Sequence, residues 1–387
     1  MPLLEDPASF TTLPREFYLD DARLFEAELD RVWYRQWLYL AHGSELPEPG
    51  DYVVREHLGE SVLLVRDRDG ELGAMLNVCR HRGARMVDAP CGRLKRVVCP
   101  YHQWTYGLDG RLVGAPSMPD GDAIDYASLG LYRLPLETWR GFVFGCLGEL
   151  PPPASIGAEI AALAPSLEAS EPERLRPVET RTYDCAGNWK AMLENYLECY
   201  HCSASHPEFC TTADLRLRTG DDYVAQAYDE HPYWGMDIAL RAGVATASAT
   251  GAPVCRVPLS GADFSGRSRT FGDWAASAVL YFYADYAMVH EIQPVSPTRS
   301  RMRLTWLVDE RAQPGDVDVD ALAHVWDMTT RQDVALIERT QLGLQSRRYR
   351  PGPLSAKHEP YIRSSLDLYL AAMEGDETVA RLLDAAA

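Results

Sequence analysis

The sequence offers no segment that could cross a membrane. Its apolar stretch at residues 278–289 is shorter than the roughly 20 apolar residues that a spanning helix needs, and Asp285 interrupts it. We therefore expect no membrane partner.

An excess of positive charge is also missing. The chain has 38 Lys and Arg against 56 Asp and Glu, which gives a formal net charge of −18. Such a surface repels phosphate backbones and anionic headgroups, so nucleic acid is not an expected partner. The same charge would steer a cationic substrate toward the protein.

Two motifs for redox cofactors are absent as well. The chain contains no Gly-x-Gly-x-x-Gly nucleotide loop and no C-x4-C-x2-C cluster run. Their absence indicates that the chain does not itself take electrons from a nicotinamide.

The cysteines show no disulfide framework. There are nine, an odd number, and residues 1–6 are acidic, unlike a secretory signal, so we expect a cytoplasmic location where thiols stay reduced. Cys199 and Cys202 form a C-x-x-C pair outside any βαβ setting. We expect them to be small buried thiols.

Four residues in the first third of the chain form a motif that chance seldom produces. Cys79 and His81 make a C-x-H pair, seventeen residues follow, and Cys99 and His102 make a C-x-x-H pair. Two thiolates can hold one iron of a [2Fe–2S] cluster while two imidazoles hold the other, which raises the reduction potential. A structural zinc site is the alternative, although zinc sites of this composition normally group cysteines with cysteines and histidines with histidines.

A second motif follows about a hundred residues later. The segment 188–207 has few helix breakers before Pro207, so we expect one helix over most of it, with Glu194, Glu198 and His201 on one face. His206 lies near the end of this expected helix. Two histidines and one carboxylate on one side of Fe(II) leave coordination positions open for oxygen and substrate.

Together the two motifs resemble the alpha subunit of Rieske non-heme iron oxygenases. The flanks fit too, with Arg82-Gly83 after the first pair and Pro100-Tyr101 and Trp104 around the second. In the second motif, E-x-x-H-x-x-x-x-H matches the family pattern. The resemblance covers nearly the whole chain.

The resemblance implies roles for individual residues. His201 and His206 would be ligands of a mononuclear Fe(II), and Glu198 would be the carboxylate that connects the two metal centres. Asn195 joins Glu198 in the expected catalytic set.

The third iron ligand of the family is an aspartate on a C-terminal helix. The segment 331–338, with residues that follow it, matches that region, so the resemblance points to Asp333. Asp327 lies six residues earlier in the same expected helix and is the alternative.

Cofactors and partners also follow from the resemblance. They are a [2Fe–2S] cluster, a mononuclear Fe(II), O2 as cosubstrate, and NAD(P)H electrons delivered by a separate flavin and iron–sulfur reductase. Family members form trimers, so we expect a homotrimer in which Glu198 bridges His201 and the partner subunit's His102.

The fold class expected is α+β. An all-β [2Fe–2S] domain would span 38–150, and a catalytic domain with an antiparallel sheet flanked by helices, helix-grip-like, would span 151–387 after the break at 151–153. Residues 1–37 would form a helical segment that packs with the catalytic domain. A length of 387 residues suits two or three domains.

Periodicity predicts the main elements. An amphipathic helix is expected over 20–37 and a long helix over 318–346. Strands are expected from residue 38 onward, with turns at Pro49-Gly50, 68–70 and Asp109-Gly110. In the catalytic domain, 278–294 and 301–308 are expected to be paired antiparallel strands.

The substrate is less constrained by the sequence. The second motif, residues 112–116, and glutamate at position 198 look most like the branch that oxidises glycine betaine, choline or carnitine. Such enzymes hydroxylate a carbon beside a quaternary nitrogen, and an N-methyl carbinol then releases formaldehyde. Several aromatic residues could form a cation–π cage around the ammonium group. Alternation of such residues in a strand, however, more often means ordinary packing. The candidates are Tyr233, Trp234, Tyr281, Phe282, Tyr283 and Tyr286.

Two other functions stay open at this point. One is hydroxylation of an aromatic or natural-product scaffold by the same metal centres. The other is not enzymatic, a Rieske electron carrier whose second domain only binds a partner. The carrier would need no mononuclear iron, so replacement of His201 or His206 would leave its activity unchanged.

Overall fold

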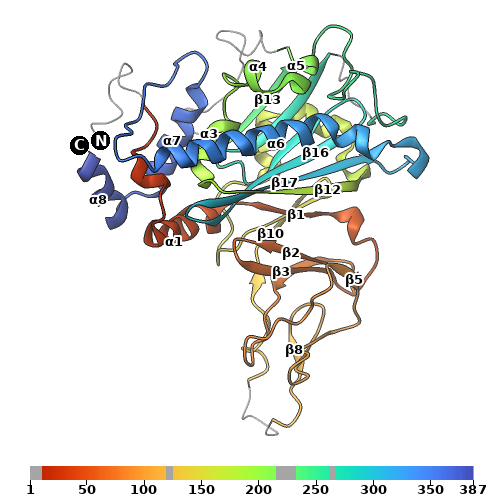
Figure 1. Cartoon of the computed structure of the whole chain (residues 1–387). Coiled ribbons are helices and arrows are strands. Elements are labelled where there is room, and N and C mark those ends of the chain that lie inside the picture. The colour runs from red at the N-terminus through yellow and green to blue at the C-terminus, as the bar shows by residue number, and fades with distance from the viewer. Residues whose placement is uncertain (1–10, 119–124, 215–231, 261–265, 387) are drawn as a thin grey trace. The chain divides into compact units, whose positions relative to one another are not determined.

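The computed structural model describes residues 11–118, 125–214, 232–260 and 266–386 (Figure 1). They form two compact units. The first joins the described residues up to Tyr34 to the chain from Ile156 onward, and the second spans Arg35–Ser155. The domain ranges expected from the sequence stay predictions.

The unit Arg35–Ser155 consists of short antiparallel strands. Gly50, Gly70 and Gly110 have φ angles of +91°, +89° and +81°, which residues with a Cβ atom rarely adopt, so the expected turns are confirmed. The sheet orders are β1-β11-β10, β5-β2-β3-β4-β9 and β6-β7-β8. The strands are β1 (Leu38–His42), β2 (Asp51–His57), β3 (Glu60–Arg66), β4 (Leu72–Leu76), β5 (Cys91–Arg93), β6 (Val97–Val98), β7 (Thr105–Tyr106), β8 (Leu112–Gly114), β9 (Arg133–Leu134), β10 (Leu136–Trp139) and β11 (Phe142–Gly145).

The other unit is built on a six-stranded antiparallel sheet in the order β12-β17-β16-β15-β14-β13. Its strands are β12 (Leu175–Cys185), β13 (Tyr233–Ala239), β14 (Arg267–Asp273), β15 (Val279–Phe282), β16 (Ala287–Ser296) and β17 (Arg299–Asp309). The first eight residues of β16 are buried, as expected of a central strand covered on both faces. The α+β fold class is therefore confirmed.

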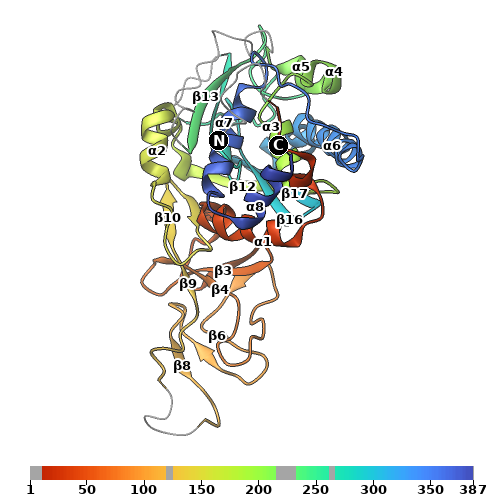
Figure 2. The ribbon, with the colours of Figure 1, turned by 90° about the vertical axis from the view of Figure 1, so that its left-hand side faces the viewer.

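Helices cover this sheet on both sides. The helices of the described residues are α1 (Ala22–Arg31), α2 (Ile156–Leu163), α3 (Trp189–Tyr196), α4 (Cys202–Ser205), α5 (Pro207–Thr212), α6 (Val319–Leu344), α7 (Pro360–Ala372) and α8 (Glu377–Ala386). Figure 2 shows α2 and α6 on opposite sides of the sheet, where α2 packs on β13 and α6 packs on β12 and β17. Short 3-10 helices lie at Arg15–Tyr18, Trp33–Arg35, Gly43–Glu45, Pro165–Ser170, Pro172–Arg174 and Pro314–Asp316.

The long C-terminal helix is confirmed as α6. Its N-terminus is capped by the Asp318 carboxylate, which accepts the backbone N–H of Ala321 at 3.0 Å.

The expected strand at 278–294 is instead two strands, β15 and β16. Asp285 lies in the turn between them, and its carboxylate accepts the backbone N–H groups of Val254 and Cys255. β16 pairs with β17 as expected.

Two expected helices are shorter than predicted. The helix at 20–37 ends at Arg31, and only a short 3-10 turn follows. The single helix expected over 188–207 is wrong, because α3 ends at Tyr196 and the chain turns before α4. The carboxylate of Glu198 accepts the backbone N–H groups of Tyr200 and His201, which replaces helical hydrogen bonds.

The early end of α3 separates residues that were expected to share a face. Glu194 is in α3 and accepts a hydrogen bond from the hydroxyl of Tyr18, whereas Glu198 and His201 lie in the turn. The one-face arrangement is therefore wrong for Glu194.

Among the described residues, no helix is both long and apolar enough to span a bilayer.

Candidate metal centres

The four residues of the first motif lie on two loops of similar shape. Cys79 starts a loop after β4, where its N–H bonds Ala84 O and its carbonyl accepts the N–H of Gly83 at 2.9 Å. Cys99 starts a loop after β6, where its N–H bonds Trp104 O and its carbonyl accepts the N–H of Gln103 at 3.0 Å. Each loop therefore presents one cysteine and one histidine from a tight turn.

The side chains of these loops converge. The ring centroids of His81 and His102 are 4.7 Å apart, and the His81 ring stacks on Trp104 at 4.7 Å. Cys79 and Cys99 are buried in the apolar core of the unit. Nδ1 of His81 is buried without a hydrogen-bond partner, which fits an atom whose lone pair binds a metal. Two thiolates and two imidazoles could hold a [2Fe–2S] cluster here.

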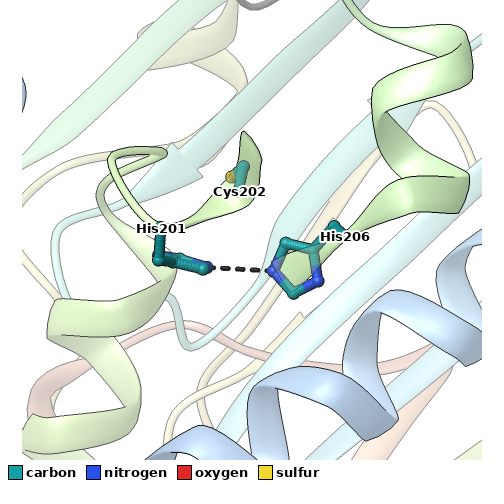
Figure 3. Close-up of side chains that lie close together, drawn as sticks. All are labelled: His201, Cys202 and His206. Atoms are coloured by element: carbon teal, nitrogen blue, oxygen red, sulfur yellow. Dashed lines mark hydrogen bonds between the residues drawn. The ribbon is translucent and has the colours of Figure 1, made fainter. Parts of the chain in front are cut away.

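The second centre joins three segments of the other unit. His201 and His206 flank α4, and Asp333 comes from the middle of α6. Nε2 of His201 is 3.0 Å from Nε2 of His206 and 3.2 Å from Oδ1 of Asp333. Nε2 of His206 is 2.9 Å from the same oxygen. Figure 3 shows the two imidazole rings pointing toward one another.

The three atoms, Nε2 of His201, Nε2 of His206 and Oδ1 of Asp333, form a triangle with the dimensions of one face of an octahedron. Bonds of about 2.1 Å at right angles place adjacent ligand atoms about 3.0 Å apart, whereas tetrahedral bonds of that length place them about 3.4 Å apart. The observed separations of 2.9, 3.0 and 3.2 Å fit the octahedral face. Two histidines and one carboxylate in this arrangement suit non-heme Fe(II).

The electrostatics of the triangle favour a bound cation. Burial lowers the pKa of His201, but hydrogen bonds to Asp333 and Glu198 outweigh it and raise this pKa to about 9. Burial raises the pKa of Asp333, but hydrogen bonds to His201 and His206 outweigh it and hold the pKa below its usual range. Both shifts show that the site attracts positive charge.

Both histidines are oriented by a partner on the other ring nitrogen. Nδ1 of His201 bonds the Glu198 carboxylate, and Nδ1 of His206 bonds the side-chain oxygen of Gln332 at 2.8 Å. Gln332 in turn donates to Glu208 at 2.8 Å, which leaves its oxygen facing His206. Protons on both Nδ1 atoms leave both Nε2 lone pairs directed at the metal position.

Gln332 is a functional candidate that the sequence reasoning missed, because its only signal is its place beside Asp333. In a Gln332→Leu variant we expect iron affinity to fall about 10- to 100-fold, since His206 loses the acceptor that orients it. Chelator competition on the reconstituted protein measures this. Glu208→Gln is the matched control, because it keeps Gln332 in place. Iron retention in Gln332→Leu equal to that of the wild type would contradict the orienting role of Gln332.

The other predicted residues are placed as follows. The amide nitrogen of Asn195 is 3.4 Å from Nε2 of His201, so Asn195 borders the triangle. Asp327 does not reach it, because its carboxylate bonds Tyr183 at 2.6 Å and Arg331 at 3.0 Å. The geometry therefore favours Asp333 over Asp327.

The interpretation of Cys199 and Cys202 as free thiols is wrong. The turn after α3 brings their Cα atoms to 4.9 Å, and the two sulfurs form a disulfide on either side of His201 in the chain. Sγ of Cys202 lies within 4.8 Å of one ring nitrogen of His201 and one of His206. Because this sulfur is bonded to Cys199, it is not a thiolate ligand.

The disulfide predicts a thiol count. The chain has nine cysteines, of which seven are free. Denatured, cluster-free protein should therefore react at seven thiols without reductant and at nine after reduction. A Cys202→Ser variant should show eight thiols under both conditions. Nine thiols in the unreduced wild type would contradict the pairing.

The aromatic residues considered for a cage are divided between the two faces of the sheet. The Tyr233 ring stacks on Phe271 at 5.7 Å, and strand alternation points Phe282 away from the face that carries Tyr281. The Tyr281 hydroxyl bonds the Tyr196 hydroxyl, and its ring lies 5.0 Å from that of Trp326 in α6. Tyr283 and Tyr286 stack on each other at 4.7 Å.

Two known domain families match the chain. Residues 172–375 match the catalytic domain of the ring hydroxylating alpha subunit, and residues 36–136 match the Rieske [2Fe-2S] domain. The chain is a Rieske oxygenase alpha subunit. These two domains imply iron cofactors, and the catalytic domain contradicts the electron-carrier alternative.

Individual relatives of this Rieske oxygenase match nearly all or about half of its length. It is 32% identical over 395 residues to the glycine betaine monooxygenase oxygenase subunit of Pseudomonas aeruginosa (strain UCBPP-PA14), covering 94% of this chain and 89% of that protein. It is 38% identical over 213 residues to the carnitine monooxygenase oxygenase subunit of Escherichia coli (strain K12), covering 54% and 56%.

A solved structure shares the fold. The quaternary ammonium Rieske monooxygenase CntA, in complex with an inhibitor, matches with a TM-score of 0.77 and 24% identity over 96% of this chain and 97% of that chain. The expected family, and its nearness to the glycine betaine and carnitine branch, are confirmed.

Proposed function

We propose that this Rieske oxygenase hydroxylates a quaternary-ammonium compound, by oxidative N-demethylation or by hydroxylation of a neighbouring carbon. The observation that carries the proposal is the triangle of His201, His206 and Asp333, with ligand atoms 2.9 to 3.2 Å apart, beside aromatic residues on α3 and the sheet. Relatives named for glycine betaine and carnitine support the substrate class.

The proposed cofactors divide between the two units. Cys79 and Cys99 would hold one iron of the cluster, and His81 and His102 the other. His201, His206 and Asp333 would hold the mononuclear iron. When bound, these irons supply one-electron transfer and activation of O2.

The protein's own groups would bind and orient the substrate. Tyr196 directly follows Asn195 at the edge of the triangle, and its hydroxyl bonds that of Tyr281. A methylammonium group is attracted to the faces of such rings. Asn195 would offer its amide as a donor at the edge of the site. Glu198 would accept the Nδ1 proton of His201 in a hydrogen bond and keep Nε2 of that ring directed at the metal position.

The overall reaction balances with two electrons from a nicotinamide. For N-demethylation, the substrate R–N⁺(CH3)3, O2, NAD(P)H and H⁺ give the carbinol R–N⁺(CH3)2CH2OH, water and NAD(P)⁺. The C–N bond of the carbinol then breaks to give R–N(CH3)2, formaldehyde and H⁺. An oxygenase subunit implies a reductase, and a separate flavin and iron–sulfur protein is proposed for that role.

We also propose a homotrimer in which the cluster of one chain serves the iron of another. A structure of a related quaternary ammonium Rieske monooxygenase is described as giving insight into inter-subunit electron transfer. In this arrangement Glu198 would hydrogen-bond the partner subunit's His102. An isolated chain with both metals would then turn over poorly.

The test is turnover with defined substrates. Iron-reconstituted protein with a competent reductase should consume NADH and release formaldehyde with glycine betaine, choline or carnitine, and His206→Ala should not. Indole serves as a neutral ring compound. Oxygen uptake with indole alone would favour the alternative, hydroxylation of an aromatic or natural-product scaffold, over an ammonium substrate.

A further inference from the structure

Three buried side chains on one face of the catalytic sheet have polar atoms without a hydrogen-bond partner. They are the Ser268 and Thr270 hydroxyls on β14 and both ring nitrogens of His290 on β16. Their residues are 0%, 1% and 4% exposed. Buried polar groups are almost always hydrogen-bonded in folded proteins, so a group of three on one face indicates a missing partner.

Strand register places this group around Tyr281. Thr270 pairs with Tyr281, and His290 pairs with Val279 two residues earlier in β15. Directly paired residues of antiparallel strands point to the same face, and residues two apart do so as well. Thr270, Tyr281 and His290 therefore share one face.

His290 links this face to the triangle. Its ring lies edge-on to that of Tyr196, with centroids 4.6 Å apart. Tyr196 directly follows Asn195, whose amide nitrogen is 3.4 Å from Nε2 of His201. His290 is also close enough to Asp333 for the carboxylate charge to act on its ring. The unpartnered imidazole therefore lies beside the proposed iron site.

The chemistry of His290 suits an oxygen acceptor on a small molecule. Burial lowers the pKa of His290 to about 4, and the opposing charge of Asp333 does not outweigh it. At neutral pH the ring therefore carries one N–H donor and one free lone pair. A buried donor that no protein group satisfies is available to a ligand that enters with its own acceptor.

We propose that His290 donates a hydrogen bond to the carboxylate or hydroxyl oxygen of the substrate, and so determines which carbon faces the iron. The proposal rests on the quaternary-ammonium function and adds recognition of the oxygen group at the other end of the substrate. The aromatic rings take the ammonium group, and His290 takes the oxygen at the other end. His290 is then a specificity-determining residue of this face.

The test compares trimethylammonium compounds whose fourth nitrogen substituent carries a carboxylate, a hydroxyl or no oxygen. Glycine betaine offers a carboxylate, choline offers a hydroxyl, and tetramethylammonium offers neither. In the wild type we expect KM, and Kd from anaerobic calorimetry on the iron-loaded enzyme, to be about 10- to 100-fold lower for betaine or choline than for tetramethylammonium. In His290→Leu this ratio should fall to about 1 to 2.

Two further variants separate recognition from structure. His290→Gln keeps an N–H donor and should restore part of the ratio, which also covers the case that His290→Leu folds poorly. Val279→Ala removes volume opposite His290 on the same face and should change KM for all three compounds by one common factor.

The outcomes distinguish the two proposals. A wild type that binds and oxidises none of the three compounds, and does not oxidise carnitine either, would overturn the ammonium function. An active wild type whose His290 variants change all three compounds equally would overturn the role of His290 alone. A preserved preference for betaine or choline in His290→Leu would do the same. Loss of the betaine preference alone, or of the choline preference alone, identifies which oxygen His290 recognises.

Discussion

Replacing His206 with alanine is expected to remove one iron atom per chain and abolish oxygenation while leaving the cluster intact. Nε2 of His206 is one of three atoms in the proposed iron triangle, and its side chain is 1% exposed. With one ligand lost, the two that remain no longer hold a face of the metal. The wild type should contain three irons and two acid-labile sulfides, and the variant two irons and two sulfides.

Visible and EPR spectra provide the internal reference, because the Rieske signal reports the other unit and should be unchanged. His324→Ala is the matched control, since His324 is an exposed histidine on α6 and its loss should leave three irons. Two irons in the wild type after anaerobic Fe(II) reconstitution would contradict the assignment of the triangle as an iron site.

Replacing Lys190 with methionine is expected to destabilise the catalytic unit by about 3–5 kcal/mol. The Lys190 ammonium is buried 2.5 Å from a carboxylate oxygen of Glu28, with side chains 1% and 2% exposed. It also lies over the rings of Trp189, Tyr18 and Tyr369, at 5.0 to 5.8 Å from their centroids. Methionine would leave the Glu28 charge buried with only neutral donors from Trp189 and Tyr369.

Urea unfolding, followed by tryptophan fluorescence, measures this loss. The double variant Glu28→Gln/Lys190→Met removes both charges and should recover most of the stability, because no unpaired charge remains. Loss of the exposed pair between Arg267 and Asp237 should cost less than about 1 kcal/mol. A Lys190→Met effect as small as that of the exposed pair would contradict the buried-charge account.

Local spacing carried most of the functional prediction. The C-x-H and C-x-x-H pairs and the histidines at 201 and 206 are readable because ligand chemistry needs particular residue types a few positions apart. The family, the fold class and the long helix α6 were predicted correctly for the same reason, since each has a local pattern. Spacing was less reliable where a helix ends, as α3 does at Tyr196.

The errors share a physical origin. The helix expected over 188–207 stops because the Glu198 carboxylate competes for backbone N–H groups, and side-chain competition of this kind leaves no periodic signal. The Cys199 and Cys202 sulfurs bond because that stop folds the chain into a turn. One local contact therefore changed both the helix and the state of the two cysteines.

The chemical identity of the protein, with its cluster motif, its two histidines and its family, was already set by the order of the residues, because those signals act over a few positions. Folding was needed to favour Asp333 over Asp327, to join Lys190 to Glu28, and to leave His290 without a partner beside the proposed iron site. These features bring together segments separated by about a hundred residues or more. Their geometry depends on the register of α6 and of the strands, which no short stretch of sequence encodes.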